Sequence, residues 1–132
     1  MKNEQEGASR TYVLCNDNMV IAYYSLATGA IAQTSATGKV RCNMPDPIPV
    51  MLIGRLAVDC HWQNRGIGSA MLKDAILRIL QGAEIAGIRA ILVHAISEDA
   101  KKFYEKYGFT ASPIDPMTLM VKISDIKVTL GL

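Results

Sequence analysis

The residues best suited to chemistry lie in a short connector between an apolar run and a helical pattern. The connector consists of Gln63, Asn64, Arg65, Gly66, Ile67 and Gly68. Two glycines one residue apart let the backbone turn tightly and bring a ligand close to its amides. From Ser69 the pattern is helical, and a helix start carries unpaired N–H groups and a partial positive charge. The connector therefore predicts an anion site that could hold phosphate groups.

Two common phosphate motifs do not fit this connector. A P-loop needs a lysine followed by Ser or Thr after its second glycine, and here Gly68 is followed by Ser-Ala. A dinucleotide fingerprint needs Gly or Ala where Met71 stands, and it begins at the strand end, whereas residues 61–65 intervene here. A Gln-x-x-Gly-x-Gly pattern remains, and a plain strand-to-helix turn is the alternative interpretation.

The segments around the connector predict the elements that position it. The run VMLIGRLAVD, residues 50–59, is almost unbroken, which is typical of a central strand covered on both faces. A helix from Ser69 to about Ala86 has one apolar face and ends at Gly87. That face comprises Leu72, Ile76, Ile79, Leu80 and Ala83. A second apolar run, residues 90–95, follows this helix and should lie parallel to the first.

The rest of the chain predicts further strands around this centre. Residues 10–15 and 19–27 are β-prone and flank Asn-Asp-Asn, a hairpin signal. Residues 30–40 are ambiguous between weak strand and loop, and the prolines of residues 43–49 exclude a helix there.

Near the C-terminus we expect one more helix and one more strand. Ser97 is a plausible N-cap for a helix that runs to Tyr107, and residues 118–123 predict the last strand. Residues 1–9 should be frayed and residues 124–132 a short tail. The resulting order, β-β-loop-β-α-β-α-β, predicts an α/β domain with a mixed sheet.

Composition indicates one globular domain. The chain has 132 residues, of which half are apolar and a fifth are charged. No window reaches the roughly 18 apolar residues of a membrane span, and the N-terminus lacks a hydrophobic signal region, so we expect a cytoplasmic protein without membrane contact. Three widely spaced cysteines and two histidines show no metal-ligand spacing, which predicts reduced thiols and no metal site. The net charge of +2 alone does not argue for nucleic acid.

Two motifs together resemble the GCN5-related N-acetyltransferase (GNAT) family. The connector resembles its Gln/Arg-x-x-Gly-x-Gly/Ala loop, and residues 100–109, AKKFYEKYGF, are similar to its A-x-x-F-Y-x-x-x-G-F signature. The resemblance implies the GNAT fold, a mixed and mostly antiparallel sheet with a splayed central parallel strand pair and flanking helices. It implies acetyl-CoA as cofactor, with the strand backbone along the pantetheine arm and the loop amides on the pyrophosphate. The cofactor-binding residues would be Leu56, Ala57, Val58, Gln63, Asn64, Arg65, Gly66, Ile67, Gly68 and Ser69.

The same resemblance assigns catalysis to Tyr104. In many members of the family this tyrosine protonates the departing coenzyme A thiolate, and a phenol positioned by a helix can supply that proton. The alternative is that Tyr104 only packs beside Phe103. Tyr107 and Phe109 are expected in the core or the cofactor wall, and Ser97 and Ala100 near the thiol end.

With its flanks included, residues 10–123 resemble the acetyltransferase toxins of toxin–antitoxin modules. These toxins acetylate the α-amino group of aminoacyl-tRNA and stop translation. The resemblance implies a ribbon-helix-helix antitoxin and a homodimer as assemblies. Relatives of this type carry a further strand and helices before the segment that matches Arg10. We therefore expect residues 1–132 to form a single GNAT acetyltransferase domain without those elements, which help to form the acceptor groove.

The residues themselves also bear on the acceptor. The apolar strand holds no carboxylate before Asp59. A lysine amine, with a pKa of about 10.4, often needs a base, whereas an α-amine starts near about 7.7–8.0 and needs little help. A water-relayed base fits equally well. Seven basic residues lie within residues 39–89, and of these Arg41, Arg55 and Arg78 could bind an RNA acceptor, with an ordinary solvated surface as the alternative.

Two other functions stay open at this point. The first is an acetyltransferase for a small amine or a protein N-terminus, which salt dependence would separate from a tRNA enzyme. The second is an acetyl-CoA-binding or antitoxin-binding form without catalysis.

Overall fold

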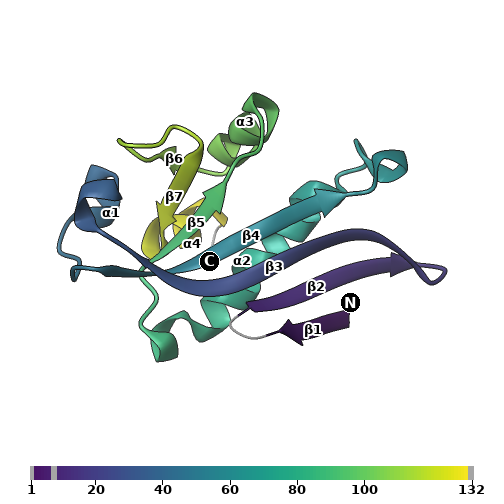
Figure 1. Cartoon of the computed structure of the whole chain (residues 1–132), viewed down its shortest axis with the longest axis horizontal. Coiled ribbons are helices and arrows are strands. Elements are labelled where there is room, and N and C mark those ends of the chain that lie inside the picture. The colour runs from purple at the N-terminus through teal and green to yellow at the C-terminus, as the bar shows by residue number, and fades with distance from the viewer. Residues whose placement is uncertain (1, 7–8, 131–132) are drawn as a thin grey trace.

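The computed structural model describes residues 2–6 and 9–130 and contains one seven-stranded sheet in the order β1-β2-β3-β4-β5-β7-β6 (Figure 1). The strands are β1 Lys2–Glu6, β2 Ser9–Asn16, β3 Met19–Ile31, β4 Ile48–Val58, β5 Ala90–His94, β6 Thr110–Ala111 and β7 Thr118–Lys122. The helices are α1 Gly38–Arg41, α2 Ile67–Ala86, α3 Glu98–Lys106 and α4 Ile123–Leu130, with short 3-10 turns η1 Gln33–Ser35 and η2 Cys60–Trp62. The predicted mixed sheet is confirmed: β4 and β5 are parallel, and the other strand pairs are antiparallel.

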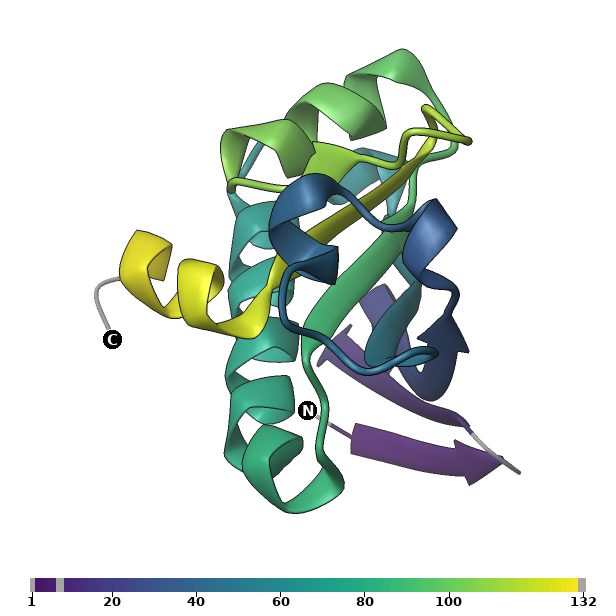
Figure 2. The ribbon, with the colours of Figure 1, turned by 90° about the vertical axis from the view of Figure 1, so that its left-hand side faces the viewer.

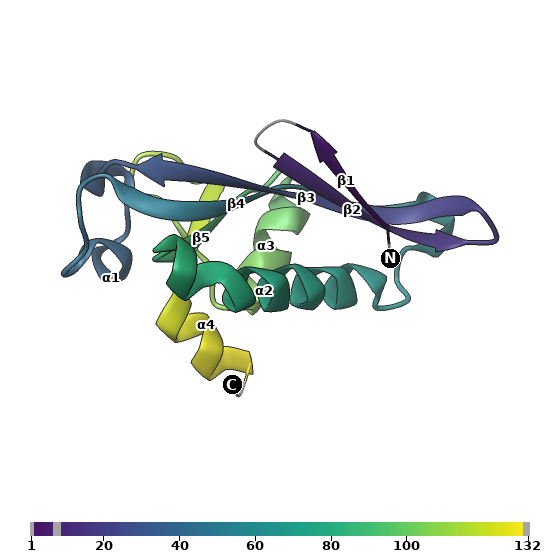
Figure 3. The same ribbon diagram turned by 90° about the horizontal axis from the view of Figure 1, so that it is seen from below.

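The two sheet faces are covered by different helices. Figure 2 shows α1 on the side of β5 and β7 opposite to α2, and Figure 3 shows α2 and α4 together on one side of the strands. Along β5, Ile91 and Val93 belong to the core under α2, while Ala90 and Leu92 belong to a smaller core under α1. Alternate side chains point to opposite faces of a strand, so both sets must be apolar when both faces are covered. This explains the continuous apolar run in the sequence.

The long helix α2 supplies the main core, as its periodicity predicts. Leu72, Ile76, Ile79 and Ala83 are buried, Leu80 packs partly against the same cluster, and Met71 and Ala75 are buried with them. Gly87 ends the helix with a φ of +71°, a conformation that favours glycine.

A bulge at Gly54 separates two parts of β4. Ser25 pairs with Arg55 and the next residue of β3, Leu26, pairs with Ile53, so Gly54 is the extra residue. A Cβ at Gly54 would lie 2.9 Å from the Ser25 Oγ, which explains the glycine. Pairing between β4 and β5 also stops at Ile53, opposite Val93. Bulges bend a strand and increase its twist, so β4 leaves β5 at this point. The predicted splay of the parallel pair is therefore present.

Several local predictions are confirmed. The β2–β3 hairpin turns at Asp17 and Asn18, whose φ angles of 49° and 69° suit a two-residue turn. No helix forms within residues 43–47, and β4 begins at Ile48. The α3 helix is capped by Ser97, whose Oγ accepts the Ala100 N–H at 3.1 Å.

Other predictions about the ends and the ambiguous segment are corrected. Residues 2–6 form β1, paired with β2, where we predicted frayed chain; residues 1, 7 and 8 lie outside the described part. Residues 123–130 form α4 instead of a tail, because Ile126 is fully buried and Ile123 and Leu130 pack beside it at helical spacing. The ambiguous segment 30–40 divides into the end of β3, η1 and most of α1. None of the helices within the described residues is long and apolar enough to cross a membrane.

Candidate active site

A cleft of about 690 Å³ opens where β4 and β5 diverge. Its wall is formed by the second half of β4, the loop after η2, the start of α2, the end of β5 and one side of α3. Of the predicted site residues, it includes Leu56, Ala57, Val58, Gln63, Asn64, Gly66, Gly68, Ser69, Arg55 and Tyr104. The structure thus brings residues from two separate motifs around one cavity of a size typical for small-molecule sites.

The β4 edge presents free backbone groups to this cleft. The Asp59 N–H donates to the Ile21 carbonyl at 2.7 Å, so these two residues form a hydrogen-bonded antiparallel pair. Such pairs alternate along the ladder, so the N–H and C=O groups of Ala57 also point to β3. Those of Leu56 and Val58 point away from β3. Since β5 has already diverged, those groups face the cleft. A ligand amide could therefore pair with Leu56 and with the N–H of Val58, whose carbonyl already accepts from Gln63, but Ala57 can contribute only its side chain.

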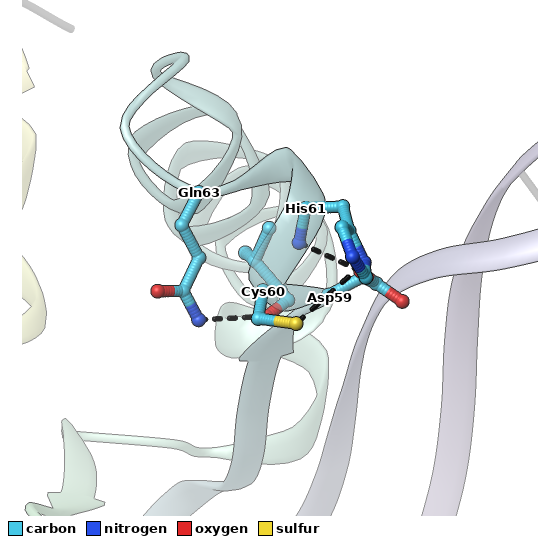
Figure 4. A network of polar contacts seen from close by, with 5 residues as sticks. Asp59, Cys60, His61 and Gln63 are labelled. Atoms are coloured by element: carbon cyan, nitrogen blue, oxygen red, sulfur yellow. Dashed lines mark hydrogen bonds and ion pairs between the residues drawn. The ribbon is translucent and has the colours of Figure 1, made fainter.

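The loop after β4 is held by side chains of its own (Figure 4). The Asp59 carboxylate accepts the His61 N–H at 2.8 Å and caps η2. The Gln63 Nε2 donates to the Val58 carbonyl at 3.1 Å, which ties the loop to the last residue of β4. Asn64 and Gly66 then take positive φ angles of 63° and 79°. These contacts fix the path of the backbone into α2.

The start of α2 fits an anion, as the connector predicts. The Ala70 N–H donates to the Gly66 carbonyl at 3.1 Å, which is the first hydrogen bond of the helix. The N–H groups of residues 67–69 therefore have no carbonyl acceptor within the helix. A Cβ at Gly68 would lie 3.9 Å from both Phe103 and Val58, in the narrow part between α3 and β4. Free amides and the helix dipole together favour a phosphate here.

Tyr104 faces the cleft from α3. It is 6% exposed and packs edge-on against Phe103 and tilted against Phe109, with ring centroids 5.3 and 5.7 Å away. Burial raises the pKa of the Tyr104 hydroxyl above its ordinary value near 10. The phenol therefore keeps its proton at neutral pH. Tyr104 therefore both packs beside Phe103 and lines the cleft.

The predicted neighbours of Tyr104 divide between cleft and core. Ala100 lines the cleft, while Phe109 is buried in the core and Tyr107 packs partly against it. Ser97 caps α3 and is not part of the cleft wall.

Four of the predicted binding residues, Arg41, Arg65, Ile67 and Arg78, lie outside the cleft wall. The Arg65 guanidinium stacks over the Trp62 ring at 4.7 Å, and Ile67 packs against the core. Arg41 lies on α1, near the start of β4, whereas the loop follows the end of β4 (Figure 1).

Arg78 takes part in a cluster between α2 and the sheet. Its Nε donates to Asp74 at 3.0 Å, and its guanidinium lies 4.4 Å from the Tyr12 ring. The Tyr24 hydroxyl donates to the same Asp74 carboxylate, and burial followed by this bond raises the Tyr24 pKa. Arg41, Arg55 and Arg78 therefore do not surround one cavity, because only Arg55 reaches the cleft.

Three polar cleft residues were not singled out from the sequence: Tyr23, His94 and Asp99. His94 is the last residue of β5, and ligands bind beyond the carboxyl ends of parallel strands. That position is a signal that could have identified it.

The one group of potential metal ligands found among the described residues is Asp59, Cys60 and His61, whose ligand atoms lie within 4.8 Å of one another. The sequence predicts no metal site. Cys60 and His61 are exposed and Asp59 already caps η2, so the grouping is explained by the turn.

Comparison with known proteins identifies the family. The family described as acetyltransferase (GNAT) domain matches residues 7–111. The tRNA-acetylating toxin of Mycobacterium tuberculosis is 47% identical over 131 residues, which are 99% of this chain and 79% of that protein.

Solved structures agree on the fold. AtaT in complex with acetyl-methionyl-tRNAfMet is similar with a TM-score of 0.83 and 24% identity, over 93% of this chain and 76% of that one. A mutant AtaT bound to the C-terminus of the antitoxin AtaR and acetyl-CoA is similar with a TM-score of 0.76 and 24% identity, over 94% and 73%. The family match and the close relative together establish that this chain belongs to the GNAT acetyltransferase family.

Proposed function

We propose that this chain is a toxin that transfers the acetyl group of acetyl-CoA to the α-amino group of aminoacyl-tRNA and so blocks translation. The observation that carries this proposal is the 47% identity to the tRNA-acetylating toxin over almost the whole chain. The cleft supports it, because donor-binding backbone and a buried tyrosine meet there.

The cleft fits acetyl-CoA as the donor. The backbone groups of Leu56 and the N–H of Val58 point away from β3 and could pair with the amides of the pantetheine arm, while the Val58 carbonyl accepts from Gln63. The amides of residues 67–69 are free to hold the pyrophosphate, and Gln63 and Asn64 fix the loop around it. Bound in this way, the donor supplies an activated acetyl thioester. Arg65, which stacks on Trp62 at the loop surface, would add charge near the phosphates.

Tyr104 is the proposed catalytic acid. Tyr104 lines the cleft, and its hydroxyl stays protonated at neutral pH because burial raises its pKa. It gives this proton to the sulfur that leaves when the amine has attacked the thioester carbonyl. The protein also contributes by holding amine and thioester in attack geometry.

The acceptor side is proposed to bind the charged end of a tRNA. Arg55 lines the cleft and would meet a phosphate of the acceptor end there. Arg41 would contact more distant backbone, and Arg78, already engaged with Asp74, would contribute least. We further propose a cytoplasmic protein that forms a homodimer and is neutralised by a ribbon-helix-helix antitoxin. Residues 1–132 would act as one acetyltransferase domain.

The test is transfer of labelled acetyl from acetyl-CoA onto a pool of charged tRNA. We expect label on aminoacyl-tRNA, none on deacylated tRNA, and transfer that falls steeply with added salt. Free amino-acid esters and a peptide with a free N-terminus serve as competing acceptors. Label on those small amines, without label on charged tRNA and without salt dependence, would contradict the proposal.

A further inference from the structure

His94 ends β5 at the point where two cavities meet. The first is the cleft already described, and the second, of about 350 Å³, lies between the end of β3 and the β6–β7 region. Among the described residues, His94 alone borders both cavities. A donor in the cleft and an acceptor that enters through the second cavity would therefore meet beside this imidazole.

One hydrogen bond holds the His94 ring from the side of β7, and a second fixes the residue that makes it. The His94 Nδ1 lies 2.9 Å from the Thr118 Oγ1, and the Thr118 hydroxyl donates to the Asp115 Oδ2 at 2.8 Å. A second oxygen of Asp115 accepts the Met117 N–H at 3.0 Å. The three side chains thus form a chain from the turn before β7 to the end of β5.

The directions of these bonds determine the tautomer of His94. A threonine hydroxyl has one proton, and here it points to Asp115. The Thr118 oxygen can then only accept from His94, so Nδ1 carries the ring proton. In a neutral imidazole the other nitrogen, Nε2, is left with a free lone pair.

Asp115 is well placed to keep this direction. Its hydrogen bonds from Thr118 and Met117 lower the pKa of the carboxyl below its usual range. An ionised carboxylate only accepts hydrogen bonds, so it cannot reverse the chain.

We propose that the His94 Nε2 accepts the proton of the incoming amine, with Thr118 and Asp115 as positioning residues. This inference rests on the proposed function. The amine nitrogen forms a bond to the acetyl carbonyl carbon, the carbon–sulfur bond breaks, the amine proton passes to His94, and Tyr104 protonates the leaving sulfur. His94 then loses its proton to solvent and Tyr104 regains one.

The charges around His94 suit this role. The titratable groups that share its cavities are Tyr23, Arg55, Asp99, Tyr104 and Asp115. The carboxylates of Asp99 and Asp115 favour the imidazolium that forms, while Arg55 opposes it. A base on β5 also explains how the site can work without a carboxylate in residues 50–58.

The experiment compares pH profiles of kcat/KM for charged tRNA in wild type, His94→Asn, Asp115→Asn and Thr118→Val. In Asp115→Asn the new amide keeps an oxygen for the Met117 N–H but presents N–H to Thr118. The hydroxyl would then donate to Nδ1, and the ring proton would move to Nε2. His61→Asn, which removes the other histidine of the chain, is the matched control.

We expect kcat/KM at pH 7 to fall about 10²-fold in His94→Asn and by a similar factor in Asp115→Asn. Wild type needs both a neutral amine and a neutral His94, so its logarithmic profile should approach slope 2 at acid pH. His94→Asn should rise with slope 1. The binding of acetyl-CoA and the unfolding midpoint should stay as in wild type, and imidazole should restore activity to His94→Gly.

Other results would overturn the inference. If wild type transfers acetyl to charged tRNA and His94→Asn has the same rate and the same slope, then His94 is not the base. The proposed function would stand in that case. A loss of rate with slope 2 retained and no rescue by imidazole shows that His94 is structural. No transfer to charged tRNA by wild type removes the proposed function and the role of His94 together.

Discussion

The proposed donor side and the proposed acceptor side of the active site are built in different ways. The proposed donor side consists mainly of backbone groups: those of Leu56 and the Val58 N–H on the edge of β4, and the amides at the start of α2. The proposed acceptor side consists of side chains from separate segments: Arg55 on β4 and His94 on β5 line the cleft, and Asp115, before β7, lines the adjoining second cavity. Backbone sites depend on local conformation, whereas side-chain sites depend on which segments the fold brings together. The two sides should therefore respond differently to substitution.

The largest effect is expected at Tyr104, where the two sides meet. Tyr104→Phe removes the proton donor but keeps the ring against Phe103 and Phe109. We expect kcat to fall by about 10² to 10⁴, with the dissociation constant of acetyl-CoA almost unchanged. Single-turnover transfer and calorimetric binding measure the two quantities. Full activity in Tyr104→Phe would show that Tyr104 only packs against its neighbours and does not donate the proton.

A matched pair of glycines tests the backbone character of the donor side. A Cβ added at either Gly66 or Gly82 would meet open space, but only Gly66 has a positive φ, of 79°. Gly66→Ala should destabilise the native loop by about 1–2 kcal/mol and weaken acetyl-CoA binding about tenfold. Gly82→Ala, within α2, should leave binding unchanged and stabilise the fold by about 0.5–1 kcal/mol. Calorimetric titration and thermal unfolding check both; equal binding by the two variants would contradict a conformational role of Gly66.

The central fold, and the residues that line the proposed donor side of the cleft, could be predicted because their signals are local. The apolar run of β4, the Gln-x-x-Gly-x-Gly loop and the amphipathic α2 are contiguous in the sequence, and each has a pattern set by backbone geometry. The helix α4 was missed although Ile123, Ile126 and Leu130 have helical spacing. A short segment is stable as a helix only when something covers it, and that depends on tertiary contacts.

The acceptor side could not be predicted in the same way. His94 and Thr118 are 24 residues apart in the sequence, so no local pattern indicates their contact. The sequence likewise does not show that Arg78 is already engaged by Tyr12 and Asp74. Gly54 likewise appears only as a glycine inside a strand, although the bulge there separates β4 from β5. The sequence shows residue types, but which of them face one cavity follows from strand order and register.

Arg55 and Arg78 test whether position in the cleft decides acceptor binding. Arg55→Gln should raise KM for charged tRNA several-fold and reduce the salt slope by about 1, because one phosphate contact is lost. Arg78→Gln should leave KM unchanged and lower the free energy of unfolding by about 1 kcal/mol, through loss of the contacts to Asp74 and Tyr12. Steady-state kinetics at several salt concentrations and urea unfolding separate the two. A larger effect on KM from Arg78→Gln would show that the acceptor lies along α2 instead.

The smallest expected effect concerns kcat, which should not change at moderately alkaline pH. In the proposed mechanism Tyr104 acts as an acid only while protonated, so its contribution is lost as pH rises through its pKa. Burial raises that pKa above the ordinary value near 10, so the loss occurs at more alkaline pH than for an exposed tyrosine. At saturating donor and acceptor, kcat should therefore stay level between about pH 8 and 9.5. A fall within this range in wild type, absent from the residual activity of Tyr104→Phe, would mean that the hydroxyl is more exposed in the working enzyme than the packing of Phe103 and Phe109 allows.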